Sequence, residues 1–171
     1  LATKNGMPYV RDAIAFVEAQ TFRDFELIVQ DGGSTDGTAE YLAALEGVPT
    51  IDFVSEPDRG LGDAYNRASA RCKGAIVGTI DSDNLLLPHA LEEAVAFFDA
   101  DPNCAALYGA VRLVDQLGQL LGMFAPAEFD VNTLLRSQLV PSLSTGFLAR
   151  DLCGEDLRCV ARHATCHDLA L

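Results

Sequence analysis

Short apolar runs alternate with segments of helical periodicity along the first hundred or so residues of the chain. Runs of about four to eight apolar residues bounded by glycine or polar residues are typical of strands buried on both faces. Such runs predict strands at residues 1–3, 25–29, 50–54, 75–80 and 104–108. Apolar positions at helical spacing predict helices over residues 9–20, 35–45, 61–71 and from Pro88 onward. In the first helix these positions are Val10, Ala13, Ile14 and Val17. Because a helix follows each of the first four strands, we predict an α/β fold of parallel β–α–β units in a doubly wound sheet.

The pattern changes after Gly109. Residues 111–114 and 120–124, joined through residues 116–118, predict an antiparallel hairpin. Residues 130–137 predict a short helix, and residues 144–148 predict one more strand. We expect this second half of the chain to lie across one end of the sheet.

Composition and charge narrow the class of protein. The chain has 171 residues, 49% of them hydrophobic, which predicts one globular domain with a sizeable core. Its net charge of −13 argues against non-specific binding to nucleic acid or to an anionic membrane surface. The same charge is compatible with a site that recruits a divalent cation.

Targeting and redox signals are sparse. No apolar run approaches the roughly 20 residues of a membrane span, and no signal peptide is recognisable. The chain opens at Leu1 without a methionine and closes on Leu171, so we expect a fragment trimmed at both ends. An odd number of cysteines without a close pair predicts reduced thiols in a cytoplasmic protein. A metal site from Cys159, Cys166, His163 and His167 is the less favoured alternative.

The strongest candidate for chemistry ends the fourth predicted strand. Residues 75–84 read AIVGTIDSDN, so an apolar run stops at Asp81 and Asp83. Ligands of open α/β sheets bind beyond the carboxyl ends of the strands. In an extended chain, side chains two residues apart point to the same side, so both carboxylates could face one Mg²⁺ or Mn²⁺. Aspartates also mark turns and helix caps, so the motif depends on its context.

Two further loops supply that context. Residues 31–38 (DGGSTDGT) follow a predicted strand and open a helix, where Ser34, Thr35 or Asp36 can act as the cap. An ordinary turn between a strand and a helix, without a ligand, would have a similar sequence. Asp31, at the end of the strand, is harder to explain as a cap and indicates a ligand with hydrogen-bond donors, such as a nucleoside.

The loop after the third strand is also rich in polar residues. Residues 56–66 place Asp63 and Asn66 on one helical face. Arg59 and Arg67 could meet phosphate or could be solvated surface charges. Because these loops must share one edge of a parallel sheet, they predict a metal-dependent nucleotide site.

An ordered set of motifs resembles the N-terminal half of family 2 glycosyltransferases. They are residues 3–5 (TKN), 20–29 (QTFRDFELIV), 31–38 (DGGSTDGT), 55–60 (SEPDRG), 63–66 (DAYN) and 81–83 (DSD). The resemblance implies a Rossmann-like GT-A fold, with a mostly parallel sheet and a small hairpin region after the metal-binding motif. It also implies an inverting transfer of a sugar from a nucleoside diphosphate to a glycan, lipid or polysaccharide acceptor.

The resemblance assigns roles to individual residues. Asp83 would bind Mg²⁺ or Mn²⁺ bridging the diphosphate, and Asp81 would contact the ribose or support the metal. The other donor-binding positions are Ala2, Thr3, Asn5, Asp31 and Asp63. Two positions depart from many relatives: Gly32 stands where they carry a second carboxylate, and Lys4 where they often carry tyrosine.

An inverting transfer needs a general base for the acceptor hydroxyl. In the family this residue lies in a late Asp-x-Asp-Leu-like stretch, and residues 167–171 read HDLAL. Aligning Asp168 with the first aspartate keeps its spacing to Leu171, so Asp168 is the candidate base. A register shifted by two would place Cys166 there instead and leave no base.

We therefore expect one glycosyltransferase domain, with a donor half at residues 1–108 and an acceptor half at residues 109–171. Its partners would be a nucleoside-diphosphate sugar and a glycan or lipid-linked acceptor, with no nucleic acid and with a homo-oligomer left open. The expected location is the cytoplasm or the cytoplasmic face of the membrane. A non-catalytic nucleotide-sugar-binding or partner-binding module on the same fold is the alternative.

Overall fold

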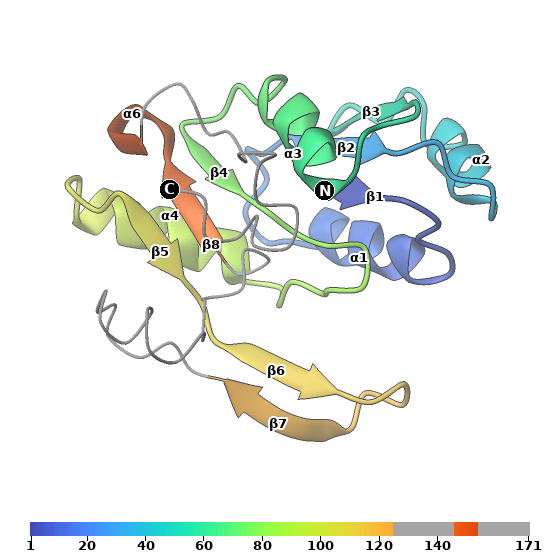
Figure 1. The fold of residues 1–171 in the computed structure, drawn as a ribbon. Coiled ribbons are helices and arrows are strands. Elements are labelled where there is room, and N and C mark those ends of the chain that lie inside the picture. Colours follow the sequence, from blue (N-terminus) through green and yellow to red (C-terminus); the bar gives the residue numbers. More distant parts are fainter. Residues whose placement is uncertain (125–145, 154–171) are drawn as a thin grey trace.

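The computed structural model describes residues 1–124 and 146–153, and Figure 1 shows their arrangement. The strands are β1 (Ala2–Thr3), β2 (Leu27–Asp31), β3 (Ile51–Ser55), β4 (Ile76–Gly78), β5 (Ala106–Tyr108), β6 (Val111–Val114), β7 (Leu120–Phe124) and β8 (Gly146–Ala149). The helices are α1 (Tyr9–Glu18), α2 (Thr38–Ala43), α3 (Leu61–Ser69), α4 (Ala90–Ala100) and α6 (Arg150–Cys153). The predicted helix at residues 130–137 and the candidate base Asp168 lie outside the described residues.

The strands of the body form two groups that meet at β1 and β4. Strands β1, β2 and β3 are parallel neighbours, whereas β8 runs antiparallel between β4 and β5. A parallel bridge between Ala2 and Asp81 connects β1 with the chain just beyond β4. The predicted α/β class is confirmed, with a parallel sheet of three strands and additional antiparallel strands. The alternation of strands and helices in the sequence did not predict that β8 lies between β4 and β5.

The prediction of a fourth strand buried on both faces is wrong. Strand β4 covers only Ile76–Gly78, and its side chains are half-buried or exposed. At Gly78 an added Cβ would lie 2.7 Å from the ring of Phe147. This close approach of β8 gives a packing reason for glycine inside β4.

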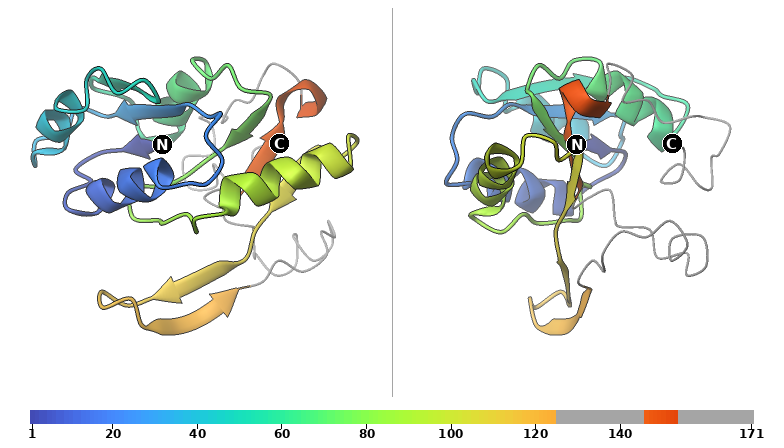
Figure 2. Two further views of the ribbon diagram at one scale, coloured as in Figure 1. Left: turned by 180° about the vertical axis from the view of Figure 1, so that it is seen from behind. Right: turned by 90° about the vertical axis from the view of Figure 1, so that its left-hand side faces the viewer.

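Helices cover the sheet on both sides, with α1 and α4 on one face and α3 on the other (Figure 2). The inner face of α1 consists of the four predicted residues, Val10, Ala13, Ile14 and Val17. They form the main core with Leu27 and Val29 of β2, Leu42 of α2 and Ile80. The predicted helix at residues 35–45 begins only at Thr38, because Gly37 has a left-handed φ of 98°.

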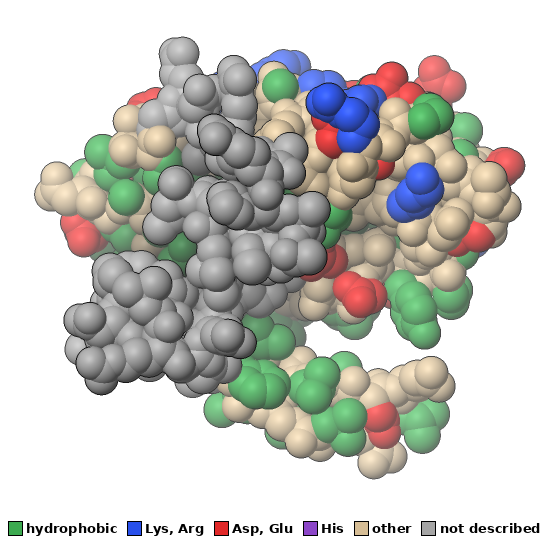
Figure 3. Space-filling model, viewed as in Figure 1, with side chains coloured by type: hydrophobic (Ala, Val, Ile, Leu, Met, Phe, Trp, Pro, Cys, Tyr) green, Lys and Arg blue, Asp and Glu red, His purple; other side chains and the backbone are tan. Residues whose placement is uncertain are grey.

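The hairpin of β6 and β7 has the bounds that the sequence predicted. It projects from the body, and apolar side chains follow its length (Figure 3). Leu120 and Met123, for example, are 63% and 64% exposed. Within the described residues, no helix is long and apolar enough to cross a membrane.

Candidate functional site

Polar residues line up across the carboxyl edge of the parallel strands. In the register of the sheet, Ser55 of β3 lies beside Asp31 of β2, and Asp31 lies beside Thr3 of β1. Asp81 follows on the other side of β1, through its bridge to Ala2. The fold therefore brings the loops after β2, β3 and β4 to one edge of the sheet, as the sequence predicted, and the end of β1 lies in the same row.

Asp31 anchors the turn that follows β2. Its carboxylate is fully buried and accepts hydrogen bonds from the Ser34 N–H at 3.0 Å, the Ser55 hydroxyl at 2.5 Å and the Ser34 hydroxyl. These hydrogen bonds hold the loop after β2 at the sheet edge. The N-cap of α2 is Gly37, so the structure agrees with the prediction that Asp31 is not a helix cap. The predicted ligand for Asp31 stays a prediction.

Asn5 joins the loops after β1 and β2. Its N–H donates to the Ser34 hydroxyl at 2.7 Å, and its side-chain Oδ1 accepts from the Thr35 N–H at 2.9 Å. Asn5 itself has a left-handed φ of 53°, a conformation that asparagine tolerates better than most residues. The two loops thus hold each other in place beside the row.

Asp81 and Asp83 lie on a turn and not on an extended segment, which corrects the prediction from the strand pattern. The Asn84 N–H donates to the Asp81 carbonyl at 3.2 Å and closes this turn. The Asn84 Nδ2 atom lies 3.4 Å from Asp81 Oδ2 and 3.2 Å from Asp83 Oδ1. Asp83 is exposed and Asp81 half-buried. The turn therefore still brings both carboxylates within reach of a single donor atom.

Thr3 contributes a hydroxyl at the centre of the row. Its Oγ1 is buried and has no hydrogen-bond partner among the residues that the structure describes. The neighbouring Gly6 leaves no space for a side chain, since an added Cβ would lie within 2.3 Å of this oxygen.

Sequence reasoning missed two residues of the site. Tyr65 of α3 donates its hydroxyl to Asp81 Oδ1 at 2.5 Å, and Asn84 contacts both aspartates as described above. The helical pattern placed Tyr65 on the apolar face of its helix, and its ring is indeed buried. The contact between its hydroxyl and Asp81 becomes visible only in the structure, where the chain beyond β4 lies beside β1.

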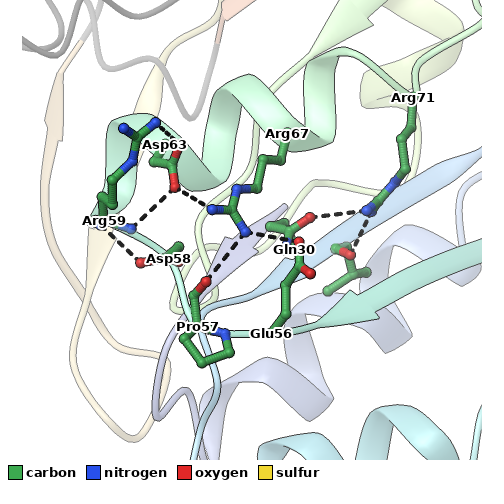
Figure 4. Close-up of polar contacts among 10 residues, drawn as sticks. Gln30, Glu56, Pro57, Asp58, Arg59, Asp63, Arg67 and Arg71 are labelled. Carbon is green, nitrogen blue, oxygen red and sulfur yellow. Dashed lines mark hydrogen bonds and ion pairs between the residues drawn. The ribbon is translucent and has the colours of Figure 1, made fainter.

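Asp63 lies at the centre of an ion-pair network on α3 (Figure 4). Its carboxylate contacts the Arg59 guanidinium at 3.0 Å, the Arg59 N–H at 3.1 Å and the Arg67 guanidinium at 2.8 Å. Arg67 also binds Glu56 at 2.8 Å and the Pro57 carbonyl at 3.2 Å. The hydrogen bond from the Arg59 side chain is the main reason that the pKa of Asp63 falls to about 2. Both arginines are therefore engaged by protein carboxylates, although Arg59 is 86% exposed.

The depressed pKa of Asp63 predicts acid sensitivity. The unfolded carboxyl has a pKa near 3.8, so between about pH 4 and pH 2 the unfolded state binds the extra proton. Stability from this group is present above that interval and is lost as the pH falls through it. We expect Asp63→Asn to flatten the decline in the free energy of unfolding over these pH values, measured by urea denaturation. An unchanged slope would contradict the ion-pair assignment.

Gly32 lies close to the loop that follows β3. A Cβ at Gly32 would lie 2.4 Å from Asp58 Oδ2, and Asp58 is held by a 2.8 Å hydrogen bond from the Gly60 N–H (Figure 4). The space at position 32 is therefore taken by the carboxylate of a neighbouring loop.

The fold and the row of polar residues define an α/β domain whose candidate site lies at the carboxyl ends of its strands. Residues 1–129 match the family described as glycosyl transferase family 2. The chain belongs to glycosyltransferase family 2, as the motifs predicted.

Relatives in sequence and structure agree with this assignment. A chondroitin synthase of Escherichia coli is 33% identical over 118 residues, which are 68% of this chain and 17% of that protein. The chain thus spans about a sixth of the length of this curated relative. The crystal structure of residues 1–349 of S. aureus TarS has a TM-score of 0.70 at 20% identity, covering 98% of this chain and 51% of that one. This likeness confirms the GT-A fold.

A second solved structure contains ligands. It is the mannosyltransferase PcManGT from Pyrobaculum calidifontis in complex with GDP-Man and Mn²⁺, with a TM-score of 0.59 and 28% identity. The match covers 66% of this chain and 34% of that one.

Proposed function

We propose that this chain is the donor-binding part of an inverting, metal-dependent glycosyltransferase. It would transfer a sugar from a nucleoside diphosphate to a glycan, lipid or polysaccharide acceptor. The observation that carries the proposal is the turn at residues 81–84, which presents two carboxylates at the end of a row formed by four strands. Membership of the family and the ligands named for PcManGT support it.

The residues of the turn fit a hard divalent cation. Mg²⁺ and Mn²⁺ prefer oxygen ligands, and one or two protein carboxylates commonly suffice when substrate phosphates complete the coordination. Asp83 is exposed, and Asp81 Oδ2 lies on the side facing Asn84. No cluster of three or more acidic, histidine or cysteine ligands occurs in residues 1–124 and 146–153, so the diphosphate would have to supply further ligands.

Each residue then has a distinct role. Asp83 would hold the metal, and Asp81 would support it or contact the ribose. The bound metal would supply Lewis-acid chemistry by neutralising charge on the diphosphate leaving group. Ala2, Thr3 and Asn5 would line the nucleotide pocket. Asp31 would shape this pocket through the loop that it anchors.

The ion pairs with Arg59 and Arg67 limit the role of Asp63 in donor binding. Since its carboxylate already binds two guanidinium groups, Asp63 would act on the donor by orienting them. Arg59, which is largely exposed, is then the cation available to a phosphate. Residues 1–108 would form the donor half and residues 109–171 the acceptor half. We also propose a cytoplasmic location, as the cysteines predicted.

Asp168 remains the proposed general base. It would accept the proton of the acceptor hydroxyl as that oxygen attacks the anomeric carbon from the face opposite the diphosphate. We expect Asp168→Asn to lower the rate of transfer by about a hundredfold or more while donor binding is retained. Steady-state rates and calorimetry on the same samples measure the two effects. Transfer at the wild-type rate would exclude Asp168 as the base.

A donor screen tests the proposal as a whole. Purified protein is heated with Mn²⁺ and each of a panel of UDP-sugars and GDP-sugars. A bound donor raises the free energy of unfolding by RT ln(1 + [L]/Kd) and therefore raises the melting temperature. The donor that stabilises most is then assayed for transfer and hydrolysis. Stabilisation with turnover supports the glycosyltransferase. Binding across the panel without any turnover would favour a non-catalytic nucleotide-sugar-binding module.

A further inference from the structure

We infer that Tyr65 is a positioning residue for the metal site: its hydroxyl holds one oxygen of Asp81 so that the other faces the cation and the diphosphate. The inference rests on the proposed function and adds a residue from a separate element. The inference depends on the contact between Tyr65 of α3 and Asp81 in the turn after β4. Neither the pattern of strands in the sequence nor the acidic motif predicts this contact.

The surroundings of Tyr65 make it a rigid support. Its side chain is 9% exposed and forms a small buried cluster with Ala64 and with Ala2 of β1. Ala2 is bridged to Asp81 through the backbone. The ring of Tyr65 therefore lies against the strand that neighbours Asp81, and its hydroxyl reaches across to the carboxylate. A buried phenol has few alternative rotamers, so this donor is fixed before any ligand arrives.

The hydrogen bond divides the two oxygens of Asp81. Oδ1 accepts the hydrogen bond from the Tyr65 hydroxyl. Oδ2 lies on the other side, 3.4 Å from the Asn84 amide that also contacts Asp83. Tyr65 therefore holds Oδ1, and Oδ2 lies on the side of Asp83.

Partners of this kind matter for metal affinity. Ligating carboxylates are usually held by hydrogen bonds, and removing such a partner typically weakens metal binding by about 10- to 100-fold. The hydroxyl is separable from the packing of the ring, because phenylalanine keeps the ring and removes the hydroxyl. Tyr65→Phe therefore tests the positioning role directly.

The experiment measures Mn²⁺ binding by electron paramagnetic resonance, with inorganic pyrophosphate present to complete the coordination. We expect Tyr65→Phe to raise the Kd for Mn²⁺ by about 10- to 100-fold while the melting temperature without metal changes little. Tyr41→Phe is the matched control, since its ring stacks on Arg11 at 4.7 Å and lies on α2, outside the turn. A Tyr65 that served packing alone would leave the Kd unchanged.

Two further variants separate the failure of this inference from that of the metal site. Asp83→Ala should weaken Mn²⁺ binding. The double variant Tyr65→Phe, Asp81→Asn should bind Mn²⁺ no more weakly than Asp81→Asn alone, because both substitutions act on the same Tyr65–Asp81 hydrogen bond. If Asp83→Ala binds Mn²⁺ less tightly and Tyr65→Phe binds it as the wild type does, the role of Tyr65 is wrong. If Asp83→Ala also binds as the wild type does, the cation site itself is wrong and the inference falls with it.

Discussion

Replacing Asp83 by alanine is expected to lower sugar transfer by about a thousandfold or more. A metal that neutralises a diphosphate leaving group contributes several kcal/mol to transition-state stabilisation, and each 1.36 kcal/mol or so is a factor of ten in rate. Asp83 is exposed, and its carboxylate contacts the amide of the adjacent Asn84 at 3.2 Å. The free energy of unfolding should therefore stay within about 0.5 kcal/mol of the wild-type value.

The measurement is kcat/KM with the donor found in the screen, at saturating Mn²⁺, together with urea denaturation of the same samples. Asp99→Ala is the matched control, because Asp99 is an exposed carboxylate on α4, outside the row of strand ends. Equal turnover by Asp83→Ala and the wild type would remove the proposed role of Asp83. A large loss in the Asp99 variant would show that net charge, and not the site, governs the rate.

Replacing Asp31 by alanine is expected to destabilise the protein by about 3 kcal/mol or more. The change leaves the Ser34 N–H and the hydroxyls of Ser34 and Ser55 without their common acceptor. Each of these hydrogen bonds contributes about 0.5–3 kcal/mol. Because Ser34 is half-buried and Ser55 exposed, water recovers part of the loss. Asp31→Asn should lose less, because its amide keeps one acceptor oxygen for these donors.

Urea denaturation measures this loss, and Asp24→Ala is the control, since Asp24 is exposed on the loop before β2. Donor binding by the Asp31 variants should be measured below their melting temperatures. A loss of less than about 1 kcal/mol together with abolished donor binding would contradict the anchoring role, because Asp31 would then serve the ligand and not the loop.

Local patterns predicted the parts of the fold that depend on local forces. The buried face of α1 and the bounds of the β6–β7 hairpin follow from periodicity and turn chemistry, and both agree with the structure. The carboxyl edge could also be predicted, because parallel β–α–β units bring the ends of their strands to one side. For that reason the loops that contain Asp31 and Asp81 were correctly expected at one edge of the sheet.

The remaining features depend on contacts between distant residues. Strand β8 inserts between β4 and β5 from a position about forty residues further along the chain than β5, and no local signal encodes such a pairing. The Tyr65 hydroxyl and the Asp58 carboxylate likewise find their neighbours only once α3 and the loop after β3 are in place. The turn at residues 81–84 was missed because the strand pattern was extended past Ile80, where the chain bends.

A crystal structure with Mn²⁺ and the nucleoside diphosphate from the screen, using the anomalous scattering of the metal, measures the central claim directly. We expect one manganese peak at about 2.0–2.6 Å from a carboxylate oxygen of Asp83, with diphosphate oxygens at similar distances. The diphosphate should lie over the row formed by Thr3, Asp31 and Asp81. A nucleotide bound at this edge with no metal at Asp83, or a metal held elsewhere on the chain, would contradict the account.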